Sequence, residues 1–353
     1  MRKIQVGNIT GKEILAKDVY NDNGVIIIPA GTVLKKEYAK KLHEIHVSEL
    51  FVVDAISEEI PEEDFTESEI SEMCSDILKN TIERFSYASG SEMDHLADVA
   101  EGVITSVIEK KEVLYNVTAV RRKDQALSDH CLSVAALSVL TALKVGFSED
   151  EAKDIAVGAL LHDIGFTDIK TEYRDVILEE QEESTAKEIK RHVVYGYMHV
   201  EKEDWLSQIS KDIILYHHER LDGSGYPFGM KGEKIKPEVR IVAICDAFDN
   251  MIYGSLCRKM KVYEAIEYIT AMSGTLFDAD YAKKFVSSIA AYPVGTIVKF
   301  SNNGNGIVIR QNNDSPTRPV CKELSKNSND EWESGKEIDM LKELTLFIVD
   351  TVE

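Results

Sequence analysis

The alternation of apolar and polar positions divides the chain into a β-rich start, a long helical middle and a β-rich end. Near the start, GVIIIPAGTVL (residues 24–34) is rich in β-branched residues and is broken by proline and glycine, which predicts short strands and turns. The segment KKEYAKKLHEI (residues 35–45) has the apolar spacing of one amphipathic helix, and ELFVVD (residues 49–54) predicts a strand after it. We therefore expect a small β-rich accessory module at residues 1–55.

The middle of the chain follows a helical period almost throughout residues 116–292. The sequence SEDE at residues 148–151 is a capping box that opens a helix, and we expect Gly165 to close that helix. A second helix, PEVRIVAICDAFDNMI, begins at Pro237, since a first helical turn tolerates proline. The pattern therefore predicts a mainly α fold whose central domain is all-helical.

The flanks of this helical segment differ from it in composition. Residues 54–101 hold 15 acidic residues against 2 basic ones, which is typical of a solvated face or a linker. We expect residues 56–115 to form an acidic linker and a helical segment. After residue 292, the runs TIVKF, GIVIR and LTLFIVD are separated by turn-rich stretches and predict a small β-rich appendage at residues 293–353.

The formal net charge of −21 limits the partners of the chain. Such a field opposes binding to a nucleic-acid polymer, because phosphates need lysine and arginine, but it does not exclude a small phosphate ligand at a metal centre. The five cysteines are scattered, which argues against a disulfide framework and against a thiolate zinc site. No apolar run approaches the roughly 18 residues needed to span a bilayer, and the start lacks a signal-peptide core, so we expect a cytoplasmic protein without membrane contact.

Histidines gather in the helical segment. Seven of the nine lie between residues 95 and 218, and six of those fall within this segment. A single histidine on an apolar face is usually a hydrogen-bonded core residue, so none of them identifies a site alone. Asp246 is more informative, because the helix IVAICDAF would bury its carboxylate, and a buried charge needs a partner or a metal. Asp249 lies one turn later on the same face.

The chemistry of these side chains is consistent with one metal site. Imidazoles and carboxylates without cysteine suit iron, manganese or zinc. Asp163 follows His162 directly and has two oxygens, so it can bridge two ions in a way that one histidine cannot. Two metals a few ångström apart can clamp a phosphate and turn a shared water into a hydroxide nucleophile. From the residues alone, the sequence favours a dinuclear phosphoesterase.

The segment HHERLDGSGYPFGMKGEKI, residues 217–235, makes the pattern specific. It closely resembles the signature of HD-GYP domains, a branch of the HD phosphohydrolases that hydrolyses the bacterial messenger cyclic di-GMP. The resemblance covers roughly residues 116–300, in the order HDIG, His192-x-x-x-Gly196, HHE, DGSGYP and DAFD. The segment VYNDNGVIIIPAGTVL also resembles a small accessory module that precedes some members.

The resemblance implies a fold, an activity and a site. The fold is an all-helical HD-type metal-dependent phosphohydrolase domain with small β-containing appendages at both ends. The activity is hydrolysis of cyclic di-GMP to pGpG, with GMP as a further product, by a hydroxide that bridges two divalent transition-metal ions. Iron or manganese is implied, and zinc is a further candidate. The implied metal ligands are His130, His162, Asp163, His192, His217, His218 and Asp246; the catalytic residues are His162 and Asp163; the substrate contacts are Arg258, Gly225 and Tyr226.

The loop DGSGYP has two interpretations. Gly223 and Gly225 would shape a loop that carries Tyr226 and Pro227. In the family this loop is linked with substrate access and with contacts to GGDEF-type diguanylate cyclases. The simpler interpretation is a rigid turn that supports the metal histidines, and the two roles are compatible. The resemblance also allows a homodimer.

Two departures from the family pattern concern metals and charge. Ala126 stands where trinuclear members carry a glutamate, so we expect two metals rather than three. Ser255 replaces the first arginine of a cationic motif that follows the last aspartates, while Arg258 is kept. Ser255, together with Phe166, favours a rival to the enzyme: a catalytically weak or inactive module that binds cyclic di-GMP or a partner protein as a sensor.

Phe166 is the third departure, because the family usually reads HDIGK and the lysine can neutralise substrate phosphate. Two interpretations are open. Either a cation is missing at this position, or Phe166 has become a packed apolar residue beside Leu160 and Leu161.

Overall fold

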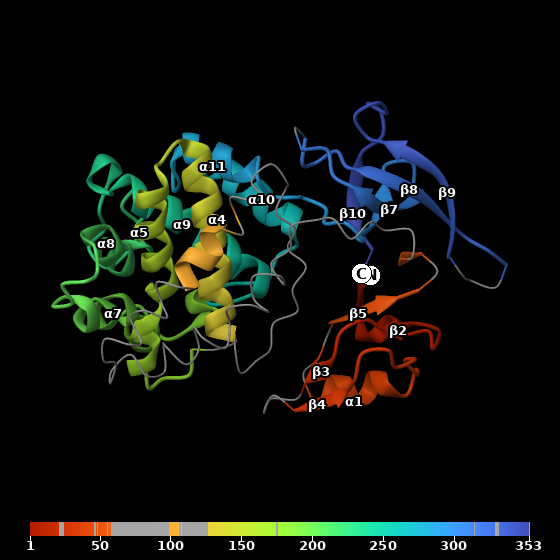
Figure 1. Cartoon of the computed structure of the whole chain (residues 1–353), viewed down its shortest axis with the longest axis horizontal. Coiled ribbons are helices and arrows are strands. Elements are labelled where there is room, and N and C mark those ends of the chain that lie inside the picture. The colour runs from red at the N-terminus through yellow and green to blue at the C-terminus, as the bar shows by residue number, and fades with distance from the viewer. Residues whose placement is uncertain are drawn as a thin grey trace. The chain divides into compact units, whose positions relative to one another are not determined.

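The computed structural model describes the two ends of the chain and its helical middle (Figure 1). By number, the described residues are 1–20, 25–45, 47, 49–54, 56–57, 99–105, 107, 126–173, 176–313, 315–328 and 332–352. They fall into two compact units, one that combines the two ends and one that holds the middle. Residues 99–105 and 107 are helical, while the remainder of the expected acidic linker from residue 58 to residue 115 lies outside the described residues. The domain boundaries expected from the sequence stay a prediction.

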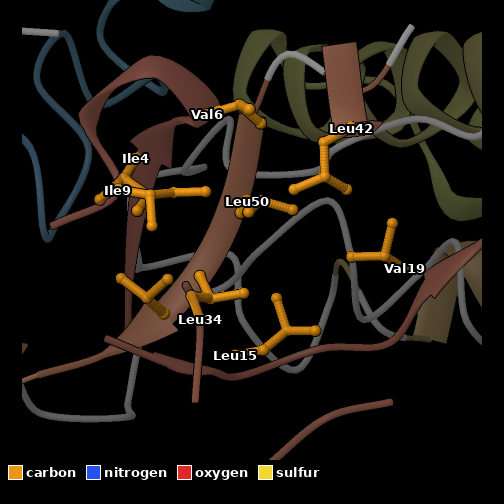
Figure 2. Close-up of a cluster of buried hydrophobic side chains, with 9 residues drawn as sticks. Ile4, Val6, Ile9, Leu15, Val19, Leu34, Leu42 and Leu50 are labelled. Atoms are coloured by element: carbon orange, nitrogen blue, oxygen red, sulfur yellow. The ribbon is translucent and has the colours of Figure 1, made fainter. Parts of the chain in front are cut away.

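The N-terminal module is a small antiparallel β structure with one α-helix. Strand β5 (Glu49–Val53) lies between β1 (Arg2–Gln5) and β2 (Ile14–Leu15), and β3 (Val19–Tyr20) pairs with β4 (Ile26–Ile28). The module also contains the 3-10 helix η1 (Val6–Asn8) and α1 (Tyr38–Glu44). Figure 2 shows its core, which is formed by Ile4, Val6, Ile9, Leu15, Val19, Leu34, Leu42, Leu50 and Val52. The short strands and the single helix predicted here are confirmed.

The C-terminal appendage is a five-stranded antiparallel sheet in the order β10-β6-β7-β8-β9. Its strands are β6 (Ile297–Phe300), β7 (Asn305–Arg310), β8 (Val320–Lys326), β9 (Trp332–Asp339) and β10 (Ile348–Thr351). The β character of this end is confirmed, but β8 and β9 were not predicted. In β9, only Ile338 is buried, so charged and small residues hide the apolar alternation that identifies a strand.

The middle unit is helical, which confirms the predicted fold class. Its described helices are α4 (Ala126–Val145), α5 (Glu149–Leu161), η5 (Ile164–Asp168), η6 (Leu178–Glu180), α6 (Glu183–Ile189), α7 (His192–Val200), α8 (Gln208–Tyr216), η7 (Gly232–Lys234), α9 (Pro237–Tyr253), α10 (Val262–Ala271) and α11 (Ala279–Val286). Helix α5 packs against α4 and α8, and α9 packs against α4, α8 and α10. Figure 1 shows α4, α5 and α9 side by side. These helices are the frame on which the candidate site is built.

The ends of two predicted helices can be compared with the sequence signals. The capping box is confirmed, because Ser148 Oγ accepts from Glu151 N–H at 3.3 Å and Ser148 N–H donates to Glu151 Oε2 at 2.8 Å. Helix α9 begins with Pro237 in its first turn, as predicted. The expectation that Gly165 closes α5 is wrong, because α5 already ends at Leu161 and Gly165 lies inside η5.

Gly165 has a different physical role. A Cβ atom at this position would lie 1.9 Å from the carbonyl oxygen of His192 and 2.5 Å from the backbone nitrogen of Gly196. Both of those residues are in α7. Glycine is therefore needed because η5 and α7 approach backbone to backbone, and not because a helix must end there.

Helix α4 has the length and composition of a membrane span. Its segment Leu127–Val145 has a mean hydropathy of 1.2, which differs from the expectation that no apolar stretch reaches spanning length. However, 83% of this stretch is buried inside the protein, and the core helix of a globular protein passes the same test. No other helix in the described part of the chain does so.

Candidate metal centre

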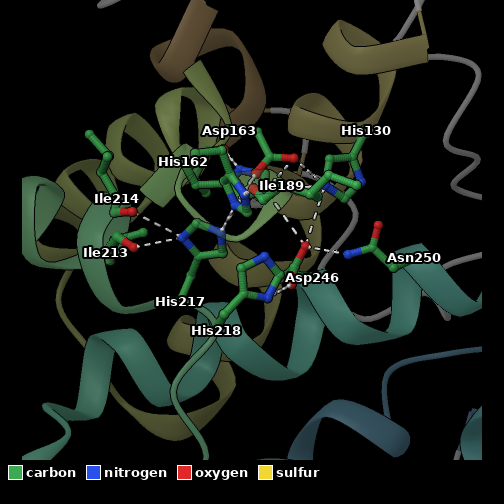
Figure 3. Close-up of polar contacts among 12 residues, drawn as sticks. His130, His162, Asp163, Ile189, Ile213, Ile214, His217, His218, Asp246 and Asn250 are labelled. Atoms are coloured by element: carbon green, nitrogen blue, oxygen red, sulfur yellow. Dashed lines mark hydrogen bonds and ion pairs between the residues drawn. The ribbon is translucent and has the colours of Figure 1, made fainter. Parts of the chain in front are cut away.

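All seven residues expected to bind metal come together in the helical unit. Figure 3 shows His130, His162, Asp163, His217, His218 and Asp246 pointing toward one another. His130 lies in the second turn of α4, His192 is the first residue of α7, and Asp246 lies in the middle of α9. His162 and Asp163 connect α5 to η5, and two more histidines directly follow α8. Each of the seven is at most 8% exposed; they are His130, His162, Asp163, His192, His217, His218 and Asp246.

The seven side chains form two groups of ligand atoms. One group contains Asp163, His192, His217 and His218, the other contains His130, His162 and Asp246, and within each group all ligand atoms lie within 4.8 Å of one another.

Asp163 connects the two groups through its two oxygens. Its Oδ1 lies 3.3 Å from His192 Nε2 and 3.6 Å from His217 Nε2. Its Oδ2 lies 3.3 Å from His130 Nε2 and 3.5 Å from His162 Nε2. One carboxylate therefore faces both groups, which is the arrangement that a bridging ligand requires.

Three of the histidines owe their orientation to helix ends. The last carbonyl groups of an α-helix have no partner within the helix. His162, which follows α5, has Nδ1 2.7 Å from the Ala159 carbonyl oxygen, and His192, which follows α6, has Nδ1 2.8 Å from that of Ile189. His217, which follows α8, has Nδ1 3.2 Å from the carbonyl oxygen of Ile214. Since a carbonyl only accepts, Nδ1 carries a proton in each ring, and Nε2 is the nitrogen that faces the cluster.

His130 is oriented by a carboxylate instead. Its Nδ1 lies 2.5 Å from Asp249 Oδ2, and Asp249 is only 2% exposed. Asp249, noted from the sequence as lying one turn after Asp246, is thus an outer partner of the site rather than a member of either group. Such carboxylate–histidine pairs fix the ring and raise its basicity as a metal ligand.

The donor set fits divalent metal ions. Nε2 of His130 and Nε2 of His162 are only 3.1 Å apart, so two lone pairs would face each other unless a cation or a proton lies between them. Asp163 Oδ1 and Asp246 Oδ2 are buried and accept no hydrogen bond from the described residues. Buried acceptors without a donor are costly, and a metal ion satisfies them. Five imidazoles and two carboxylates suit iron, manganese or zinc.

The charges of the cluster support the same conclusion. Burial raises the pKa of Asp163, but the charge of His162 and the hydrogen bond from His130 outweigh it and hold that pKa well below the usual range. Burial is also the largest cause at His192, where it overcomes the attraction of Asp163 and lowers the pKa to about 4. The bridging carboxylate is therefore ionised and the His192 ring is neutral, which are the protonation states that bind metal. At His130 and His162, burial lowers the pKa, but neighbouring carboxylates outweigh it and raise that pKa well above its usual value, so a metal ion would have to displace a proton from these two rings.

Phe166 is a packed residue. It is 5% exposed, and its ring stacks on the His192 ring with centroids 4.2 Å apart at an interplanar angle of 11°. On Tyr173 it stacks at 4.3 Å, and it shares a buried cluster with Ile169 and Ile189. The packed interpretation of Phe166 is favoured over a missing cation, although these packing partners differ from the leucines expected from the sequence. The Phe166 ring therefore packs against His192, one of the candidate metal ligands.

The DGSGYP loop is held against His218. A Cβ on Gly225 would lie 2.5 Å from the His218 carbonyl oxygen and from Arg220 N, so only glycine allows this approach. The Tyr226 ring stacks on the His218 ring at 4.6 Å. Glu219, which is 1% exposed, accepts the backbone N–H groups of Phe228 and Met230, both at 2.8 Å. Glu219, the acidic residue of the HHE motif, therefore holds the loop in place through two backbone hydrogen bonds.

A cavity of about 210 Å³ adjoins the cluster at His218. The predicted substrate residues Gly225 and Tyr226 line it, but Arg258 does not. Arg258 pairs with Glu180 at 2.8 Å, and its side chain is 77% exposed. The full lining is Leu178, Glu179, Lys190, His218, Arg220, Ser224, Gly225 and Tyr226. Lys190 and Arg220 were not predicted, although each lies two residues from a histidine of the cluster.

Comparison with known proteins identifies the family. A family model described as "HD domain" matches residues 92–281, which is more than half of the chain. The chain belongs to the HD domain family. A second model, "KOW domain associated with HD domain", matches residues 297–353, the part that forms the C-terminal sheet.

Two curated relatives are similar to this chain over long stretches of its sequence. The chain is 29% identical over 232 residues to a cyclic di-GMP phosphodiesterase from Pseudomonas aeruginosa, which is 65% of this chain and 55% of that protein. It is 34% identical over 165 residues to the cyclic di-GMP phosphodiesterase response regulator RpfG of Xanthomonas campestris, which is 45% of this chain and 43% of that one. The chain thus spans about half the length of the curated relatives it matches.

The fold also matches a solved structure. An HDG"Y"P protein from Bdellovibrio bacteriovorus aligns with a TM-score of 0.50 and 18% identity, over 80% of this chain and 97% of that one. The family resemblance predicted from the motifs and the helical HD fold are thereby confirmed.

Proposed function

We propose that this chain is a metal-dependent phosphodiesterase that hydrolyses cyclic di-GMP to pGpG, with GMP as a further product. The observation that carries the proposal is the convergence of seven buried metal-ligating side chains into two groups connected by Asp163. Relatives named as cyclic di-GMP phosphodiesterases support the substrate. A sensor without turnover would have little use for every ligand of a two-metal centre.

The residues that would hold the metals are the five histidines and two aspartates of the cluster. Two divalent ions would supply positive charge to a phosphate in its transition state and would lower the pKa of water toward neutrality. The chain itself holds the ligands ready: the Nδ1–H groups of His162 and His192 are committed to backbone carbonyls, so their rings need no reorientation. The ionised Asp163 offsets the charge of the ions, and we assign catalytic roles to Asp163 and His162.

Several finer assignments belong to the same proposal. We infer two metals rather than three, because Ala126 offers no ligand atom where a third site would need one. Iron or manganese is proposed as the resident metal. Gly225 and Tyr226 line the cavity beside His218 and are proposed as substrate contacts. Arg258 stays a prediction as a substrate contact, and it would have to leave Glu180 to serve. A cytoplasmic location, a homodimer and docking of GGDEF-type cyclases on the loop are also proposed.

The deciding experiment is an assay of cyclic di-GMP turnover by the purified chain loaded anaerobically with iron(II) or manganese(II). Chromatography should show conversion to pGpG that stops when a chelator removes the metal. The control is the same protein after chelation and reloading, which should recover turnover. Tight binding of cyclic di-GMP without any product, at full metal loading, would refute the enzyme and establish the sensor.

A further inference from the structure

The cavity beside His218 must receive an anionic substrate, yet Phe166 occupies the position at which the family usually carries a lysine. We propose that Lys190 provides the cationic contact to a substrate phosphate in this chain. The inference rests on the proposed function and deepens it, because it assigns a specificity residue to the same site.

Lys190 is fixed in position relative to the metal-facing side chains. It directly follows α6 and lies two residues before His192, whose Nδ1 binds the carbonyl oxygen of the neighbouring Ile189. Lys190 lines the cavity together with His218, which belongs to one of the two ligand groups, and its Nζ lies over the ring of Tyr226, another residue of the cavity wall. A phosphate held near His218 would therefore be accessible to the Lys190 ammonium group.

The ammonium group of Lys190 is available for such a contact. In a chain of net charge −21, Lys190 forms no ion pair with any carboxylate in the described ranges. Its Nζ instead lies 5.3 Å from the centroid of the Tyr226 ring, in the loop that borders the cavity. An aromatic ring positions a cation above its face but does not neutralise the positive charge. The ammonium group can therefore still bind an anionic ligand.

The other cations near the cavity are engaged elsewhere. Arg220 donates from NH1 to the carbonyl oxygens of His217 and Glu219, and its guanidinium group lies 5.3 Å from the Phe277 ring. Arg258 is paired with Glu180. Phe166 is buried against His192, so its position cannot present a charge to the substrate. Among the described residues of the cavity wall, Lys190 is the cation with neither a carboxylate partner nor a hydrogen bond to a backbone carbonyl.

The test compares Lys190→Met with Lys187→Met. Lys187 lies on α6 one turn earlier, is also exposed and does not line the cavity, so it matches the charge change without the proposed contact. For Lys190→Met we expect the KM for cyclic di-GMP to rise roughly ten- to a hundred-fold, as for the loss of one charged hydrogen bond, with kcat changed far less. Calorimetric binding of cyclic di-GMP to metal-depleted protein should weaken in parallel. Lys190→Arg should restore most of the affinity.

The outcomes separate this inference from the proposed function. If wild-type protein turns over cyclic di-GMP and Lys190→Met behaves like Lys187→Met in both KM and binding, the assignment of Lys190 is wrong and the phosphodiesterase stands. If fully metal-loaded wild-type protein neither binds nor hydrolyses cyclic di-GMP, the proposed function is wrong and this inference is wrong with it. Because Lys190 is exposed, we expect an unchanged melting temperature in each variant.

Discussion

Four of the five histidines in the cluster are oriented by a hydrogen bond to a group outside it. Ala159, Ile189 and Ile214 each offer a carbonyl at a helix end to a histidine three residues later. One hydrogen bond thus satisfies a carbonyl that the helix leaves without a partner and selects the ring tautomer that binds metal. The two aspartates differ, because one buried oxygen of each, Asp163 Oδ1 and Asp246 Oδ2, accepts no hydrogen bond from the described residues. Metal binding would therefore give these aspartate oxygens the partner they lack, whereas the histidine rings are already oriented before metal binds.

Replacing Asp163 by alanine should abolish hydrolysis while leaving the fold intact. The variant loses the one carboxylate that faces both ligand groups, so we expect metal content to fall well below that of wild type. Far-ultraviolet circular dichroism should remain native, because Asp163 makes no side-chain cap at the start of η5. Metal analysis and turnover check the prediction. Near-normal turnover in this variant would mean that Asp163 does not bridge metals.

Replacing Phe166 by lysine should destabilise the protein without improving turnover. The ring is buried between His192 and Tyr173, and truncating a buried phenylalanine typically costs about 3–5 kcal/mol even before a charge is buried in its place. Thermal melting of Phe166→Lys, with Phe166→Leu as the uncharged control, measures the effect. Faster turnover at an unchanged melting temperature would restore the interpretation that a cation is missing at this position.

At the scale of elements, the site depends on how closely η5 and α7 approach. Gly165 in η5 meets the backbone of His192 and Gly196 in α7, and His192 is itself a ligand candidate. The distance between these two elements therefore sets the position of His192 relative to Asp163, which lies two residues before Gly165. Packing of the backbone and geometry of the metal site are coupled at this point.

Gly165→Ala should lower both stability and metal content. A Cβ placed 1.9 Å from the His192 carbonyl oxygen forces η5 and α7 apart, and overpacking of this kind typically costs about 1–3 kcal/mol. Gly7→Ala is a suitable control, because a Cβ there meets no atom within 4 Å. Melting curves and elemental analysis should show losses for Gly165→Ala alone. Equal behaviour of the two variants would contradict this account of the η5–α7 contact.

Glu219→Gln should loosen the loop after DGSGYP. The carboxylate of Glu219 accepts two backbone N–H groups, from Phe228 and Met230, whereas a glutamine amide has one accepting oxygen. We expect amide hydrogen exchange at residues 228 and 230 to accelerate by roughly ten-fold or more, as for the loss of a charged hydrogen bond of about 1.5–3 kcal/mol. Unchanged exchange at both amides would show that the loop is held by other contacts.

The sequence predicts the parts of this structure that leave a periodic or chemical signal. The capping box at Ser148 and the start of α9 at Pro237 are local signals, and the seven ligand candidates share one chemistry. Gly165 was misassigned because a glycine after a helical pattern usually marks the end of the helix. Its role here is set instead by the close backbone of α7, which begins 27 residues later in the sequence. Lys190 was missed because an exposed lysine has no distinguishing pattern until the cavity is known.

At the scale of the whole molecule, the two compact units differ in secondary structure and in whether they contain the candidate metal ligands. The helical unit contains most of the residues that match the HD domain and every ligand candidate, whereas the unit formed by both ends contains the two β structures. We expect metal removal to act on the helical unit first, since ligand binding stabilises the fold that contains the site. The charge of the chain, −21, is compatible with a small anionic substrate only where metals and local cations offset it.

The central claim is that seven side chains form one centre for two metal ions. Elemental analysis of protein purified anaerobically and reconstituted with iron(II) or manganese(II) tests it most directly. The account predicts about two ions per chain, as in a bridged dinuclear site, and clear loss of both when Asp163 is replaced. A ratio near zero after reconstitution, or a fully occupied third site, would contradict it.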